Sequence, residues 1–147
     1  PLNKETYLET VGNFDIRQAF PDINPRFSMF SCDPLEPGRV WFFSRVQGTF
    51  TGPFADGAIK PTGKSFDMPP ETISVIFDKD GKVIRYTVGA VVDRLRGNSG
   101  GLGGIFGILY AVGRPFPFRE ARPWRKSLGF RLFDFVGNLL RKRSSSK

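Results

Sequence analysis

Carboxylates are the side chains that this sequence offers for acid–base chemistry, because none of its 147 residues is histidine. The Ser–His and Cys–His nucleophile pairs and the commonest metal ligand are therefore excluded. A carboxylate that serves as a general base near neutral pH needs a raised pKa, which requires burial or a like-charged neighbour. Asp93 is the best-placed candidate and Asp67 the next, although Arg94 beside Asp93 would lower its pKa. The single cysteine, Cys32, excludes an intramolecular disulfide and a multi-cysteine zinc site.

Three short motifs come close to ligand-binding patterns without matching them. Residues 58–65 lack the first glycine of a phosphate-binding P-loop and are followed by two prolines rather than by a helix. The glycines at 100–104 have Phe106 where a dinucleotide-binding loop has its third glycine. Asp78 and Asp80 lack the other ligand positions of a calcium loop. We interpret these motifs as turns or close backbone packing, and we expect no metal ion and no cofactor.

The charge of +8 is concentrated in the last third of the chain. Residues 1–93 contain ten Lys/Arg and twelve Asp/Glu, whereas residues 94–147 contain twelve and two. The basic part also holds six of the sixteen phenylalanines, which is unusual for a disordered tail. This contrast predicts two units, a folded body over residues 1–93 and a Gly/Pro-rich basic docking tail over residues 94–147.

The tail alternates arginines with aromatic residues, a mixture that suits two kinds of partner. Such side chains can clamp phosphates and stack on bases, or they can dock on protein surfaces and lipid headgroups. We favour docking over nucleic acid, because the aromatic residues follow a proline-spaced line without a recognisable nucleic-acid-binding module. The residues that we expect to bind the partner are Arg114, Phe116, Phe118, Arg119, Arg122, Trp124, Arg125, Arg131 and Phe135.

Apolar spacing predicts the elements that position these residues. Helical periodicity indicates an N-terminal helix over Lys4–Phe20 and a final amphipathic helix over Leu128–Leu140. Alternating or short apolar runs indicate strands over Phe27–Cys32, Val40–Thr51, Thr72–Phe77 and Val83–Val92. The last two flank Asp78–Gly81, a tight turn that makes them a β-hairpin.

A helix followed by antiparallel strands predicts an α+β fold, with the helix packed on a curved sheet. Glycines over Gly97–Gly107 disfavour a stable helix there, and three prolines favour an extended segment over Arg114–Pro123. The longest uncharged run, Gly97–Gly113, is shorter than the roughly 20 residues of a spanning helix. The chain begins with Pro1 rather than Met, from which we expect a processed protein.

Four stretches follow one another as a long strand, a loop and a final hairpin. They are Gly48–Phe54, Pro61–Lys64, Ile73–Phe77 and Asp80–Val83. In this order and spacing they resemble the SnoaL-like polyketide-cyclase family of the nuclear transport factor 2-like superfamily, over roughly residues 5–93. The resemblance implies a cone-shaped, strongly curved antiparallel sheet closed by helices over a cavity. It also implies that an Asp of the last strand, here Asp93, faces that cavity.

Two function hypotheses follow. The first is a non-catalytic accessory subunit that docks through its tail on protein subunits of a large organellar membrane complex, in contact with the membrane surface, lipid or pigment. The tail resembles those of plastid-targeted proteins of diatoms and related algae, which implies the chloroplast, the thylakoid membrane and a photosystem I–antenna supercomplex of photosynthesis. The alternative is a SnoaL-like isomerase, cyclase or carrier with Asp93 or Asp67 as acid/base. Its apolar cavity would be lined by Trp41, Phe42, Phe43, Phe50 and Tyr86.

Overall fold

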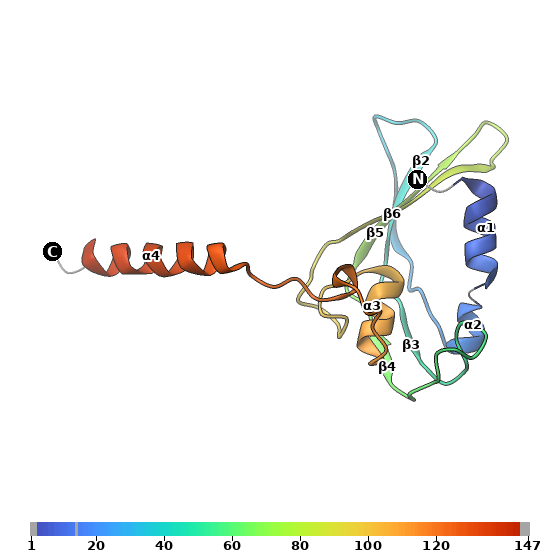
Figure 1. Ribbon diagram of the computed structural model, residues 1–147. Coiled ribbons are helices and arrows are strands. Elements are labelled where there is room, and N and C mark those ends of the chain that lie inside the picture. Colours follow the sequence, from blue (N-terminus) through green and yellow to red (C-terminus); the bar gives the residue numbers. More distant parts are fainter. Residues whose placement is uncertain (1–2, 14, 145–147) are drawn as a thin grey trace.

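A four-stranded antiparallel sheet forms the upper part of the body in the computed structural model, which describes residues 3–13 and 15–144 (Figure 1). Its strand order is β1-β2-β5-β6, with strands β1 (Ser28–Cys32), β2 (Arg39–Ser44), β5 (Glu71–Phe77) and β6 (Val83–Val91). The predicted hairpin is confirmed, because β5 and β6 pair antiparallel. Its turn is held by the Asp78 carboxylate, which accepts hydrogen bonds from the amides of Asp80 and Lys82, and by Gly81 at a φ of 74°.

The strand predicted over Val40–Thr51 is two strands in two different sheets. Strand β3 (Gln47–Thr49) pairs with β4 (Ser65–Asp67) in a separate two-stranded ladder. Between β2 and β3 the backbone bonds to an upstream segment instead: the Arg45 amide donates to the Pro25 carbonyl, and the Gln47 amide to the Asn24 carbonyl. The apolar alternation runs through this break, so the sequence pattern did not reveal it.

The N-terminal region contains two helices rather than one over Lys4–Phe20. Helix α1 (Lys4–Asn13) ends before Asp15, whose side chain accepts hydrogen bonds from the amides of Arg17 and Gln18 and caps α2 (Ile16–Ala19). An aspartate in this position favours a new helix start over continuation. Phe14, inside the predicted helix, lies outside the described residues. Helix α1 stands beside the four-stranded sheet (Figure 1), and the Tyr7 and Tyr86 rings meet there at 6.2 Å.

The main core lies at the lower end of the body, between α2, the β3–β4 ladder and α3 (Gly104–Ala111). Phe20 is its centre, with the Phe50, Phe54 and Phe66 rings 5.1–6.3 Å away. Fully or almost fully buried partners from α3 and the residue after it are Ile108, Leu109 and Val112. The expectation that residues 94–147 lie largely outside the body is therefore corrected: the first part of that segment completes the core.

Residues 97–98 attach this segment to the free edge of β4. The Asn98 amide donates to the Asp67 carbonyl at 3.0 Å, and the Asn98 side chain bonds both the Asp67 amide and the Ser65 carbonyl. Gly97 fits only without a side chain, because a Cβ there would lie 2.1 Å from the Asp67 carbonyl oxygen. These contacts fix the position of the chain just before α3. The expected absence of a helix in Gly97–Gly107 holds only up to Gly103.

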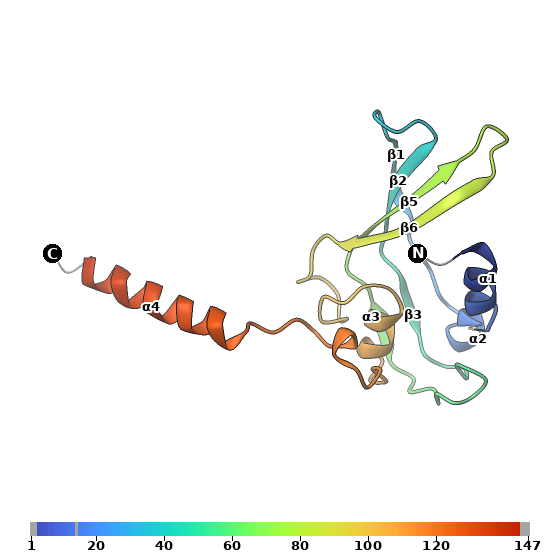
Figure 2. The same ribbon diagram turned by 45° about the horizontal axis from the view of Figure 1, so that its top comes forward.

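The last helix, α4 (Leu128–Ser144), extends away from the body in both views (Figures 1 and 2). A short 3-10 helix, η1 (Arg119–Ala121), precedes it, and residues 122–127 run without regular structure to its start. The amphipathic helix predicted over Leu128–Leu140 is confirmed. The α+β class is also confirmed, whereas the nuclear transport factor 2-like cone and the basic docking tail stay predictions.

Candidate partner-binding surface

A cluster of three phenylalanines closes the body where the chain leaves it. The Phe116 and Phe118 rings stack at 5.3 Å, and both meet the Phe106 ring of α3 edge-on at 5.7–5.8 Å. Prolines at 115 and 117 keep the chain extended, so that alternate side chains 116 and 118 point the same way. Phe116 packs against the core, while Phe118 stays 44% exposed. The cluster thus fixes the direction in which the following residues depart.

A basic groove of about 1400 Å³ lies beyond this cluster. Its walls are the end of β6, the glycine-rich loop before α3, α3 itself and residues 119–130. Four arginines line it, namely Arg94, Arg119, Arg122 and Arg125, against a single carboxylate, Glu120. Within residues 3–13 and 15–144, none of these four arginines forms an ion pair. The groove therefore keeps an uncompensated positive charge beside the aromatic rings of Phe106, Tyr110, Trp124 and Phe130.

Ser127 caps the start of helix α4, and Lys126 contacts side chains of its first two turns. The Ser127 hydroxyl accepts from the Phe130 amide at 3.1 Å, a typical N-cap contact. The Lys126 ammonium then reaches forward, bonds the Asp134 carboxylate at 3.1 Å and covers the Phe130 ring at 4.8 Å. Asp134 is the only acid of residues 122–144, so its pairing leaves the arginines of this segment unneutralised.

The opposite side of α4 is apolar and exposed. We call Leu128, Leu132, Phe135, Val136 and Leu139 the α4 stripe; their i, i+4, i+7, i+8, i+11 spacing places them on one helix face. They are 45% to 81% exposed. By the same geometry Arg131, Asp134, Asn138 and Arg141 lie off the stripe, together with the exposed rings of Phe130 and Phe133. Nothing in the described residues covers the stripe, since α4 extends away from the body.

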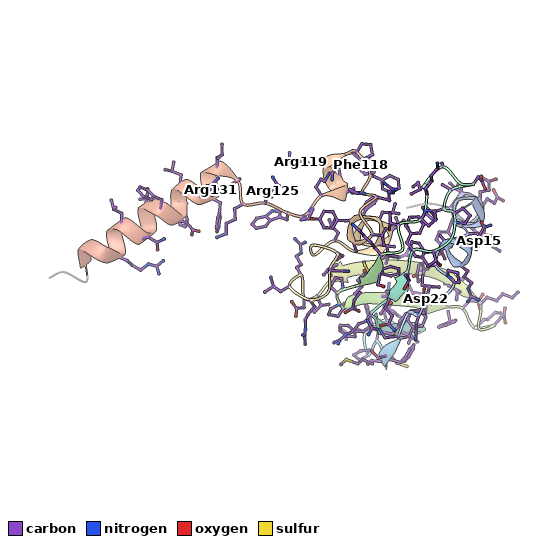
Figure 3. All side chains as sticks on the ribbon, turned by 90° about the horizontal axis from the view of Figure 1, so that it is seen from below. Asp15, Asp22, Phe118, Arg119, Arg125 and Arg131 are labelled. Carbon is purple, nitrogen blue, oxygen red and sulfur yellow. The ribbon has the colours of Figure 1, made fainter. Side chains whose placement is uncertain are left out.

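The nine residues expected to bind a partner fall into two groups. Arg114 and Phe116 belong to the body: the Arg114 guanidinium donates to the Lys60 carbonyl at 3.4 Å, and Phe116 packs on the core. The others are exposed along the departing chain, and Figure 3 shows Phe118, Arg119, Arg125 and Arg131 in this order from the body toward α4. The exposed group consists of Phe118, Arg119, Arg122, Trp124, Arg125, Arg131 and Phe135.

The five residues expected to line an apolar cavity do not come together. Strand register places Phe42 and Tyr86 on one face of the four-stranded sheet, where the Phe27 and Phe30 rings pack on Phe42 at 5.2–5.3 Å. Trp41 and Phe43 lie on the other face, and the Trp41 indole donates to the Asp33 carboxylate at 2.7 Å. Phe50 is fully buried in the main core.

Asp93 and Asp67 both have structural contacts. The Asp93 carboxylate accepts from the Leu95 amide at 3.0 Å and lies 4.0 Å from the Arg96 guanidinium, in the turn after β6. Asp67 is exposed and paired with Arg26. Neither carboxylate is buried.

Glu71 is the buried carboxylate that sequence reasoning missed. It is 5% exposed at the start of β5, and its Oε1 accepts from the Gly104 amide at the first turn of α3 at 3.0 Å. Burial raises the pKa of Glu71, and the Gly104 hydrogen bond opposes this rise. Burial, and next the nearby Tyr7 and Glu71, raise the pKa of Tyr86. The available signal was a charged residue after two prolines, at the start of a strand whose alternate residues Ile73, Val75 and Phe77 are apolar.

Within the described residues, no cluster of three or more His, Cys, Asp or Glu side chains is suited to a metal ion. None of the helices described there is long and apolar enough to cross a membrane. Compared with known proteins, the chain matches no family model, no curated protein and no solved structure.

Proposed function

We propose that this protein is a non-catalytic docking subunit, which binds the periphery of a large membrane complex through the segment that begins at Phe118. The observation that carries the proposal is the combination of unpaired arginines and exposed apolar side chains on a segment held away from the body. Large exposed apolar patches usually mark interaction sites. The arginines around them add salt-sensitive contacts with acidic groups at the rim.

The resemblance of the tail to plastid proteins of diatoms and related algae directs this proposal to the chloroplast. A photosystem I–antenna supercomplex at the thylakoid membrane is the partner that it suggests. The body, with its resemblance to SnoaL-like proteins, would then act as a spacer or a further contact surface.

Fractionation of membranes from the source cells tests this function. We expect the full chain to migrate with a membrane complex on native gels and to be released by salt. Replacing Phe118, Trp124 and Phe135 with alanine should move the protein to the free fraction, since all three are exposed and none belongs to the main core. Replacing Leu35 and Leu95, two exposed body residues, is the matched control. Retention of the triple variant in the complex would contradict the proposal.

A second candidate function rests on Glu71. Its carboxylate and the Tyr86 ring lie on the same apolar face of the sheet, with raised pKa values for both groups. A buried carboxylate of this kind suits a small-molecule-binding enzyme or carrier. Fractionation separates the two functions, because a carrier or enzyme is recovered free and soluble, without a membrane complex.

A further inference from the structure

The α4 stripe has no cover in the described residues, and the charges around it indicate what its cover must be. Residues 122–144 contain seven Lys/Arg and one Asp. Lys126 is bonded to Asp134, whereas Arg122, Arg125 and Arg131 form no ion pair with any residue that the structure describes. The partner must therefore present an apolar layer and negative charge together.

The geometry of α4 suits a flat partner. Seventeen helical residues extend about 26 Å, and the stripe, from Leu128 to Leu139, follows one face over roughly the first 18 Å of this length. Arg131 and Arg141 lie off the stripe, and their long side chains can reach a plane of charge beside it. Trp124, 68% exposed, lies four residues before the first residue of the helix, where an indole ring can lie at a polar–apolar boundary.

The approach to such a surface is open. Figures 1 and 2 show α4 extended beyond every other element, with no other helix or strand beside it. The Lys126–Phe130–Asp134 contacts lie on the polar side and order the first turns without using the stripe. A helix too polar to span a bilayer, with one apolar face and a basic flank, lies in the interface plane.

We infer that α4 binds the surface of an anionic lipid bilayer, with the α4 stripe and Trp124 in the acyl boundary and the arginines at the headgroups. This inference rests on the proposed docking function and names lipid as the partner of its last helix. An acidic protein groove and a second copy of this chain are the competing occupants, and the experiment below separates them from lipid.

The test is co-sedimentation of the purified full chain with vesicles of phosphatidylglycerol and phosphatidylcholine in equal parts, compared with vesicles of phosphatidylcholine alone. We expect binding to the anionic vesicles that weakens as salt is added. Leu132→Gln with Leu139→Gln should lower the water-to-membrane partition coefficient at least about 100-fold, because two leucines that the inference places in the acyl boundary are lost. Leu35→Gln with Leu95→Gln makes the same change on the body, at side chains 92% and 95% exposed, and should bind like the parent.

A second pair of variants tests the contribution of charge to vesicle binding. Arg131→Gln with Arg141→Gln should lower binding to anionic vesicles roughly 30-fold at low salt and flatten the salt dependence. Lys79→Gln with Lys82→Gln removes the same charge from the β5–β6 turn and should change binding far less. Circular dichroism checks that each variant keeps its helix content.

Absence of binding to the anionic vesicles, or equal binding by the Leu132/Leu139 variant, overturns the inference. Light scattering identifies self-association: a dimer that this variant dissociates, without vesicle binding, assigns the stripe to a second copy. A third outcome separates the two proposals. If α4 variants are lost from the membrane-complex fraction of cells but the purified chain does not bind vesicles, the docking function stands and the lipid inference fails.

Discussion

Glu71 is the residue at which burial and charge conflict most directly. Its carboxylate is nearly inaccessible at the junction of β5 with the start of α3, where a single amide donor was identified for it. Burial disfavours the ionised form, while a helix N-terminus favours negative charge. The raised pKa of Glu71 indicates that burial dominates. The contact between β5 and α3 is therefore stronger when this side chain is protonated.

Stability should consequently depend on pH through Glu71. The folded state binds its proton more tightly than the unfolded chain, so the free energy of unfolding falls as pH rises from about the ordinary value of 4.5 through the raised pKa. Glu71→Gln keeps an oxygen for the Gly104 amide and removes the titration. We expect the variant to match the parent in acid and to be more stable at neutral pH, measured by urea unfolding across that range.

Glu36 provides the opposite control. Its hydrogen bond with Arg39 lowers the pKa of Glu36, so its ionised form stabilises the fold. Glu36→Gln should therefore lose stability at neutral pH, and the loss should shrink as pH falls. An identical pH slope in the parent and the Glu71→Gln variant would refute the role given to Glu71.

At the scale of elements, the sequence predicted what local residues determine. The β5–β6 hairpin follows from Asp78 and Gly81 in its own turn, and α4 from its own periodicity. The break between β2 and β3 depends on Asn24 and Pro25, some twenty residues upstream, which no local pattern reveals. Helix α3 was missed because its glycines have poor helix propensity, whereas Leu109 and its neighbours gain burial from distant phenylalanines.

The attachment of the glycine-rich loop to β4 can be measured at Gly97. Gly97→Ala combines a φ of 70° with a Cβ 2.1 Å from the Asp67 carbonyl oxygen, and should destabilise the fold by at least about 3 kcal/mol. Gly81→Ala has a similar φ of 74° with no heavy atom within 4 Å of the new Cβ, and should cost about 1–2 kcal/mol. Thermal unfolding of both variants compares their losses of stability. Equal losses would mean that the loop at Gly97 shifts to accept the new Cβ without strain.

For the whole molecule, the limit of the body was the feature that composition did not place. Charge and aromatic content identify the basic region, but they do not separate residues that complete a core from residues that leave it. Phe116 packs on the core and Phe118, two residues later, is partly exposed. That distinction depends on the Phe106 ring of α3, a partner that composition does not reveal.

Two leucines of the basic region test where the body ends. Leu109→Ala removes a fully buried side chain and should cost about 3 kcal/mol of unfolding free energy. Leu128→Ala changes a side chain that is 81% exposed and should stay within about 0.5 kcal/mol of the parent. Chemical denaturation of the two variants decides the matter, and a similar cost for both would place α4 on the body in solution.

The six residues between η1 and α4 also limit how far the body can move from a surface to which α4 is bound, and so they set the effective concentration of the body at that surface. Fully extended, residues 122–127 reach roughly 20 Å, so a bound α4 holds the body within that distance of whatever it has bound. Short tethers of this kind raise local concentrations to the order of millimolar. A second contact through the body, too weak to form between free molecules, can then form once α4 is bound. The protein held by both contacts dissociates more slowly than it would from either contact alone. The apolar sheet face around Tyr86, exposed on the same body, is the surface on which this gain would act.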